Sequence, residues 1–153
     1  MKYFKLGQDR RIPYGALLPE PNGIAGYYEA KKGNLSALDD VISSFVNSSP
    51  VNYYPDILDR QLFMVKGVIK EVFDLFLPNM EYKRCLTMDD PLKRYEQYFI
   101  PGLEILDLHT GSAHKKHIFR LADTDGLEVA ASLEAVEAML RRKPTGVRIS
   151  PIV

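Results

Sequence analysis

The sequence contains no tryptophan, a single cysteine and no excess of charge of either sign. Because Cys85 has no second cysteine to pair with, the class of small folds held together by internal disulfides is excluded. The 20 basic and 20 acidic residues cancel. General nucleic-acid-binding proteins are usually strongly basic, so we expect no nucleic acid among the partners.

Long apolar runs are also missing. The most apolar stretch, residues 68–77, is interrupted by Lys70, Glu71 and Asp74, and it is far shorter than the ~20 apolar residues that a membrane span needs. The first ten residues lack the apolar segment of a secretory signal peptide. We therefore expect a cytoplasmic protein with no membrane partner.

The 153 residues are 46% hydrophobic and 26% charged, which are values typical of a globular protein. This length suits one domain, residues 1–153, because two domains would each be undersized. Residues 1–33 hold five of the ten glycines and three of the ten prolines. We expect that segment to be irregular after a short strand at residues 3–6.

Hydrophobic periodicity predicts an α+β fold. Apolar residues at three- and four-residue steps predict helices at residues 34–47, 67–77 and 133–142, and Ser132 is a suitable N-cap for the last of them. Alternation or short apolar runs predict strands at residues 62–65, 80–88, 94–100, 103–108, 116–121, 127–130 and 147–149. We expect a mixed, mostly antiparallel sheet flanked by about three helices.

Two details of strand pairing can be proposed. If the chain folds back around Ser112, Leu103 lies opposite Leu121 and Ile105 lies opposite Phe119, which is a plausible antiparallel register. Pro101 and Gly102 suit either a turn between two strands or a kinked link. Asp89, Asp90 and Pro91 predict a turn.

A weak internal repeat relates residues 64–77 to residues 128–141, at an offset of 64. Val65 then aligns with Val129, and Leu75 aligns with Met139. Each segment reads as strand, helix and strand. The pattern predicts either a duplication or two independent β-α-β units.

Histidine and cysteine are the first candidates for chemistry. His109, His114 and His117 lie within a short segment, and with Asp107 they invite a metal-site hypothesis, although their spacing fits no zinc signature. The simpler interpretation is that they are solvated or structural residues. Cys85 has no visible base or oxyanion pocket beside it, so we expect a structural cysteine and no cofactor or metal.

Tyrosine is the residue that suggests a partner surface. Six of the nine tyrosines lie in the first 54 residues, including the doublets Tyr27-Tyr28 and Tyr53-Tyr54, and Asp56 follows the second doublet. Tyrosine is enriched at protein interfaces because it buries a large area and keeps a polar tip. These five residues are the candidate contact residues, the alternative being that one tyrosine of each doublet packs inward.

A pattern over residues 60–151 resembles a known family. It begins with Leu62-Phe63-Met64-Val65 before an apolar helix and continues through Tyr98-Phe99-Ile100-Pro101. Its most specific part is Ile118-Phe119-Arg120-Leu121, then Val129-Ala130-Ala131-Ser132-Leu133, then Thr145-Gly146-Val147-Arg148-Ile149-Ser150-Pro151. This pattern is similar to immunity family eleven of bacterial polymorphic toxin systems.

The resemblance implies an inhibitor and not an enzyme. Members of such families are thought to bind a cognate protein toxin and so protect the producing cell, and they carry no catalytic residues that could be transferred to this chain. The expected function is therefore neutralisation of a toxin by direct binding. One alternative is a small metal-binding protein or enzyme that uses the three histidines and Asp107, and another is an interaction or oligomerisation domain unconnected with toxins.

Overall fold

The computed structural model describes residues 2–11, 24–111, 113 and 115–152. The helices are α1 (Tyr27–Lys31), α2 (Gly67–Phe76), α3 (Leu133–Leu140) and a 3₁₀ turn, η1 (Ala122–Thr124). The strands are β1 (Tyr3–Gln8), β2 (Val41–Phe45), β3 (Ile57–Leu58), β4 (Met64–Val65), β5 (Tyr82–Asp89), β6 (Arg94–Pro101), β7 (Ile105–Leu106), β8 (Ile118–Leu121), β9 (Val129–Ser132) and β10 (Val147–Pro151).

These strands form two sheets, where the sequence analysis expected one. The first has the strand order β10-β1-β9-β8-β7, and the second has the order β2-β5-β6-β4-β3. Most neighbouring strands are antiparallel, but β2 pairs with β5, and β7 with β8, in parallel. The α+β class with mixed, mostly antiparallel pairing and three α-helices is confirmed.

Each sheet contains a split β-α-β unit. In the first sheet β9 and β10 lie on either side of β1 and are antiparallel to it, so they run parallel to each other and α3 connects them. In the second sheet β4 and β5 flank β6 in the same way and α2 connects them. The first strand of each unit also forms a hairpin with the strand before it: β9 pairs with β8 in one sheet, and β4 pairs with β3 in the other. The strand, helix and strand order of the predicted repeat is therefore present in both halves.

The predicted offset of the repeat does not match the helix faces. An offset of 64 aligns Leu75, which is 64% exposed, with the fully buried Met139. Aligning the two N-cap residues, Lys66 and Ser132, instead places the buried Phe73 opposite Met139. Equivalent positions on the two helices then pack inward.

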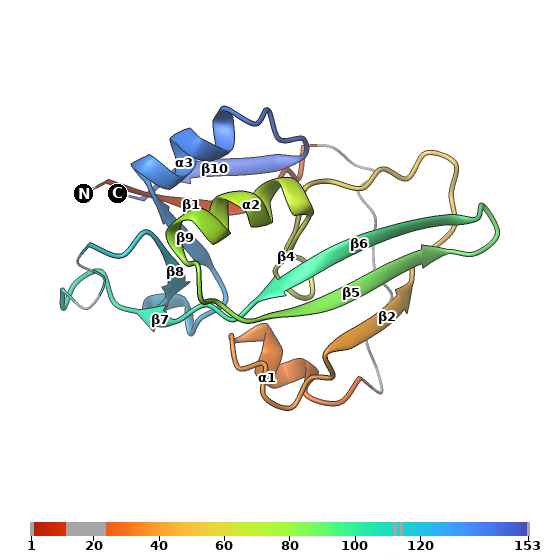
Figure 1. Ribbon diagram of the computed structural model, residues 1–153, viewed down its shortest axis with the longest axis horizontal. Coiled ribbons are helices and arrows are strands. Elements are labelled where there is room, and N and C mark those ends of the chain that lie inside the picture. The colour runs from red at the N-terminus through yellow and green to blue at the C-terminus, as the bar shows by residue number, and fades with distance from the viewer. Residues whose placement is uncertain (1, 12–23, 112, 114, 153) are drawn as a thin grey trace.

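The two helices share one core. α2 and α3 pack against each other and against the facing sides of the two sheets (Figure 1), and this core includes Phe73, Met139, Val65 and Val129. A second cluster, which includes Tyr98, Cys85 and Leu35, covers the opposite side of the second sheet. The second sheet is therefore covered on one side by α1 and residues 35–38, and on the other side α2 covers only its inner end.

Two of the three predicted helices are confirmed. Residues 67–77 form α2 and residues 133–142 form the shorter α3, with bounds that differ only at their C-terminal ends. The hydroxyl of Ser132 accepts a hydrogen bond from the backbone N–H of Ala135 at 3.2 Å, as an N-cap residue should. The predicted turn after Asp89 is also present, and it joins β5 to β6.

The predicted helix at residues 34–47 is wrong. The carboxamide oxygen of Asn34 accepts hydrogen bonds from the N–H and hydroxyl of Ser36, which closes a tight turn and starts no helix. Residues 41–45 then form β2, in which Ile42 is buried while Val41 and Phe45 are exposed. Pairing with β5 satisfies the backbone groups on one edge of this strand, so tertiary contacts override the helical spacing.

The predicted antiparallel pairing around Ser112 is also wrong. β7 and β8 run in parallel, with Ile105 opposite Arg120, because the long connection returns the chain to the other end of its partner strand. Of the two alternatives for Pro101 and Gly102, the kinked link is the one observed. The N–H of Gly102 donates to the carbonyl of Glu81 at 2.9 Å, and the chain then leaves the second sheet for the first.

The Gly/Pro-rich segment is more regular than expected where the structure describes it. β1 extends to Gln8, and α1 occupies Tyr27–Lys31. Within the described residues, no helix has both the length and the apolar character required to cross a bilayer.

Candidate interaction surface

One side of the β2–β5–β6 region carries a row of exposed apolar side chains. Directly paired residues on neighbouring strands project to the same side of a sheet. Phe45 pairs with Met88, which pairs with Tyr95. Phe45 is 57% exposed and Tyr95 is 50% exposed, so this three-strand row lies at the protein surface.

Two further rows continue the same side of the sheet. Ser43, Leu86 and Gln97 form the middle row, and Val41, Arg84 and Phe99 form the third. We call the side that carries the three rows the open sheet face. Its residues are Val41, Ser43, Phe45, Arg84, Leu86, Met88, Tyr95, Gln97 and Phe99.

The open sheet face is uncovered because α2 reaches only its inner end. There the ammonium of Lys70 lies 4.6 Å from the ring centre of Tyr82 and 5.3 Å from that of Phe99. The hydroxyl of Tyr82 donates to Asp74 at 2.9 Å. Beyond this contact the β5–β6 hairpin extends away from α2, with β2 beside it (Figure 1).

The opposite side of the same strands is anchored firmly. Cys85 and Tyr98 face each other there and are fully buried, and the Tyr98 hydroxyl donates to the carbonyl of Pro55 at 2.7 Å. Burial raises the pKa of the Cys85 thiol to about 11 and also raises the pKa of Tyr98. The thiol is therefore protonated near neutral pH, which fits a structural cysteine.

Three of the five predicted contact residues stabilise the fold. The Tyr54 side chain is only 3% exposed, and the guanidinium of Arg94 lies 4.3 Å from its ring centre. Asp56 is 8% exposed, and its carboxylate accepts the N–H of Thr145 at 2.7 Å. The hydroxyl of Tyr53 is buried against Gly146. Both tyrosines of the second doublet thus pack inward, whereas the alternative of one inward and one surface tyrosine describes the first doublet, in which Tyr27 packs against the second cluster and Tyr28 is exposed.

The first doublet lies on α1, on the other side of the second sheet from the open sheet face. Tyr28 is 77% exposed, and its ring meets the ring of Tyr27 edge-on at 5.4 Å. Tyr28 and Leu127 border a shallow hollow of about 460 Å³ with Lys31 and Lys32. The structure therefore does not bring the two doublets together into one surface.

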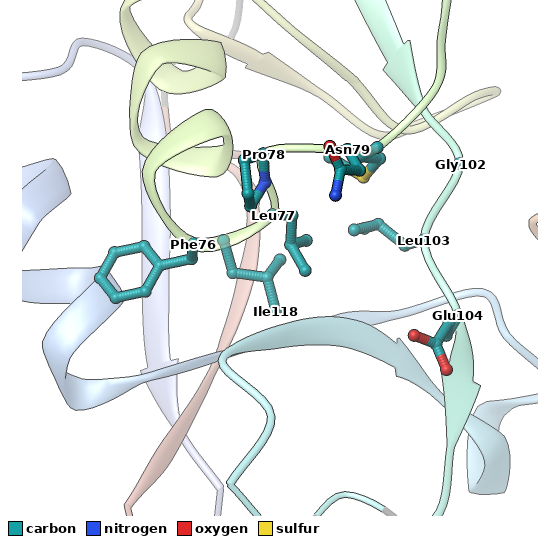
Figure 2. Close-up of a pocket in the computed structure, with 9 residues that line it drawn as sticks. Phe76, Leu77, Pro78, Asn79, Gly102, Leu103, Glu104 and Ile118 are labelled. Carbon is teal, nitrogen blue, oxygen red and sulfur yellow. The ribbon is translucent and has the colours of Figure 1, made fainter.

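A small pocket lies where the two sheets meet at the end of α2 (Figure 2). Its volume is about 310 Å³, and the side chains of Leu77, Leu103 and Ile118 point toward one another within it. Asn79 and Glu104 are the polar side chains on its lining. Glu104 is exposed and lies 3.9 Å from Lys116, so the pocket does not gather buried ionisable groups.

The histidines have separate surroundings. Nδ1 of His117 lies 2.7 Å from the Ser132 hydroxyl, and its ring packs at 4.7 Å against Phe76. The exposed His109 donates its backbone N–H to Asp107. His114 lies outside the described residues. Among the residues that are described, no group of three His, Cys, Asp or Glu could hold a metal ion, so the histidine-site hypothesis stays a prediction.

Sequence reasoning missed the fully buried Arg120. Its Nη1 donates to the carbonyls of Gly126 at 2.9 Å and Lys31 at 3.2 Å, which ties α1 to the β8–β9 connection. Burial lowers the pKa of this guanidinium to about 10, so it is still protonated at neutral pH. The only sequence signal was its position inside the apolar strand at residues 118–121.

The described residues thus contain a sheet face with three exposed large apolar side chains, the open sheet face, and no concave site with converging ionisable groups near it. Neither a scan against protein-family models nor a search of curated proteins found a match for the chain. The resemblance described above therefore remains a prediction.

Proposed function

We propose that this chain is an immunity protein that neutralises a cognate bacterial protein toxin by direct binding, without chemistry of its own. The observation that carries the proposal is the row Phe45, Met88 and Tyr95 on the open sheet face. Aromatic residues and methionine are enriched at the centres of protein interfaces. The resemblance over residues 60–151 supports the same conclusion from the sequence.

The open sheet face has the features of a binding surface. Polar side chains of Arg84, Gln97 and Ser43 lie among its apolar residues, and protein interfaces combine apolar contact area with polar groups in this way. The strands beneath it are held by the buried Cys85 and Tyr98, so the surface is rigid before binding. A rigid surface loses little conformational entropy when a partner binds.

The exposed Tyr28 on α1 offers a second surface, and it belongs to the predicted contact residues. Tyr28 has fewer apolar neighbours than the residues of the open sheet face, because Leu127 is the one aliphatic residue that borders the hollow beside it. A standard interface buries about 800 Å² on each partner. The three rows of the open sheet face meet that requirement better than a single tyrosine beside a shallow hollow.

Growth protection tests the proposal. The polypeptide encoded beside this gene would be expressed in bacteria with the wild-type chain or with a variant, and the affinity of each pair would be measured by calorimetry. Tyr95→Lys and Gln97→Lys place a charge on the open sheet face from exposed positions. We expect each variant to weaken binding at least about tenfold and to reduce protection, because an unpaired charge at an interface centre is costly.

Two controls assign the result to a surface. Leu140→Lys changes a residue that is 56% exposed on α3, in the other half of the molecule, and it should leave binding and protection unchanged. Tyr28→Lys tests the α1 surface. Normal binding by both β6 variants together with lost binding by Tyr28→Lys would move the site to α1, and failure of the wild-type chain to protect would refute the proposed function.

A further inference from the structure

Among the described residues, the outer edge of β2 is the one sheet edge longer than two residues that carries neither a charge nor a proline. Of the four edge strands in the two sheets, β3 and β7 have only two residues each, and β10 carries Arg148 and Pro151. β2 has five residues, Val-Ile-Ser-Ser-Phe, with neither charge nor proline. Proteins usually blunt edge strands with charges, proline or shortness, because unpaired backbone groups invite another strand.

The direction of the unpaired groups follows from the bonds to β5. The N–H of Arg84 donates to the carbonyl of Asp40, and the N–H of Val46 donates to the carbonyl of Met88, both at 2.9 Å. The backbone N–H and C=O groups of the even-numbered residues 40–46 therefore point toward β5. In a strand the backbone groups of successive residues point to opposite edges. The N–H and C=O groups of Val41, Ser43 and Phe45 thus point outward, and within the described residues no strand pairs with them.

We propose that this edge forms an antiparallel pair with the same edge of a second copy of the chain. The two-fold axis of the pair passes between the two Ser43 residues. In this register Ser43 meets the partner's Ser43, and Val41 meets the partner's Phe45. Outward-facing residues then meet only outward-facing residues, so each pair exchanges both of its backbone hydrogen bonds. An isologous contact of this kind closes at a dimer.

The side chains in this register are also complementary. An aromatic residue opposite a β-branched residue is a favourable cross-strand pair, and the register makes two such pairs, Phe45 with Val41 in each direction. Asp39 would meet Asn47 and Asp40 would meet Val46, so no acidic residue lies opposite another acidic residue. A second copy therefore fits the edge without repulsion between like charges.

The proposed pairing also explains why Phe45 and Val41 are exposed in a single chain. They would lie at the seam between two second sheets joined edge to edge. The row Tyr95, Met88 and Phe45 would then continue into Val41 of the second copy. The dimer does not rest on the toxin-binding proposal, because the edge pairs through backbone groups that the open sheet face does not use.

A charge-exchange experiment tests the register, because the two Ser43 residues of the proposed dimer lie opposite each other at the two-fold axis. Sedimentation velocity over a wide range of concentrations should give a dimer for the wild-type chain. Ser43→Lys and Ser43→Asp should each raise the dimer dissociation constant at least about tenfold, because like charges then lie directly opposite. Mixing the two variants should restore a dimer that contains one of each, detected with differently tagged chains.

The design separates a lost interface from a lost fold. Ser43 is exposed, so both variants should keep the wild-type circular dichroism spectrum and thermal midpoint. Gln97→Lys adds the same charge two strands away on the same side and should remain dimeric, while the toxin-binding proposal expects it to lose toxin affinity. The two proposals can therefore fail independently.

Three results would overturn the dimer. A wild-type chain that is monomeric at every concentration has no such contact. A dimer that persists in both Ser43 variants uses another surface. A monomeric chain whose Ser43 variants lose affinity for the adjacent-gene polypeptide uses β2 to bind that partner, through its edge or through the open sheet face, and not to bind a second copy.

Discussion

The carboxylate of Asp56 accepts the backbone N–H of Thr145 at 2.7 Å, and the N–H of Asp56 donates in turn to the carbonyl of Thr145 at 2.8 Å. This reciprocal contact joins the segment before β3 to the segment before β10. It therefore connects the two sheets by hydrogen bonds, in addition to the kinked link at Pro101 and Gly102 through which the chain passes from β6 to β7. Asp56 is a structural residue at the junction of the two halves.

Replacing Asp56 should lower stability. Asp56→Ala removes the charged acceptor of the Thr145 N–H, a part-buried hydrogen bond, which should reduce the free energy of unfolding by about 1–3 kcal/mol. Asp56→Asn retains an acceptor oxygen and should recover part of the loss. Urea denaturation measures both, with Asp90→Ala at an exposed turn as the control. Equal stability of the Asp56 and Asp90 alanine variants would show that Asp56 does not stabilise the junction between the two sheets.

The ring and the hydroxyl of Tyr54 should contribute differently. The ring is buried beside Arg94, whereas the hydroxyl is buried with no hydrogen-bond partner in the described part of the chain. Tyr54→Phe removes an unsatisfied polar group and should leave stability unchanged or slightly raised. Tyr54→Ala should cost about 3–5 kcal/mol through the cavity it leaves. Thermal unfolding of the two variants distinguishes a packing residue from a surface contact, for which both would be tolerated.

The sequence predicts local structure well where one face of an element is buried. The stripes of α2 and α3 and the Ser132 cap depend on contacts within the element or directly beneath it. Residues 34–47 have a similar stripe, but the hydrogen bonds between Asn34 and Ser36 and the pairing of β2 with β5 direct them into a turn and a strand. Distant pairing of this kind leaves no periodic signal in the segment itself.

The sequence indicates part of the open sheet face. Tyr82, Leu86 and Met88 alternate with polar residues, a pattern typical of a half-buried strand whose apolar side faces the core. The structure buries Cys85 and Thr87 on the other side, and exposes Arg84 between Tyr82 and Leu86. Arg84 was therefore the signal that the apolar series faces outward. What the sequence could not supply was the length of α2, which determines how far that side is covered.

Gly146 should tolerate substitution far less than Gly111. Both have positive φ angles, 70° and 80°, which disfavour a side chain. A Cβ at Gly146 would also lie 2.3 Å from the Pro55 Cβ, whereas a Cβ at Gly111 would meet no atom within 4 Å. Gly111→Ala should cost about 1–2 kcal/mol from backbone strain alone, and Gly146→Ala should cost distinctly more. Similar unfolding midpoints in urea for the two variants would contradict the close packing of Gly146 against Pro55.

The buried thiol of Cys85 should make stability fall in alkaline solution. Burial raises its pKa from an ordinary value near 9 to about 11, so the unfolded chain loses the thiol proton first. Between these two values the folded state binds more protons, and the free energy of unfolding therefore decreases as the pH rises. The decrease should reach about 1–3 kcal/mol, and it should be absent below pH 8, where the thiol is protonated in both states.

Denaturation with urea between pH 7 and pH 10 measures this slope, and Cys85→Ala provides the matched variant. The variant loses some packing at every pH, so the comparison concerns the slope and not the absolute stability. Between pH 9 and pH 10 the wild-type curve should fall more steeply than the variant curve. Tyr82 and Tyr98, whose pKa values are also raised by burial, add the same trend to both proteins at higher pH. Parallel curves of unfolding free energy against pH for the two proteins would mean that burial does not raise the pKa of the Cys85 thiol. Rapid alkylation of the wild-type thiol at pH 8 without denaturant would lead to the same conclusion, because the packing around Cys85 should protect it until the chain unfolds.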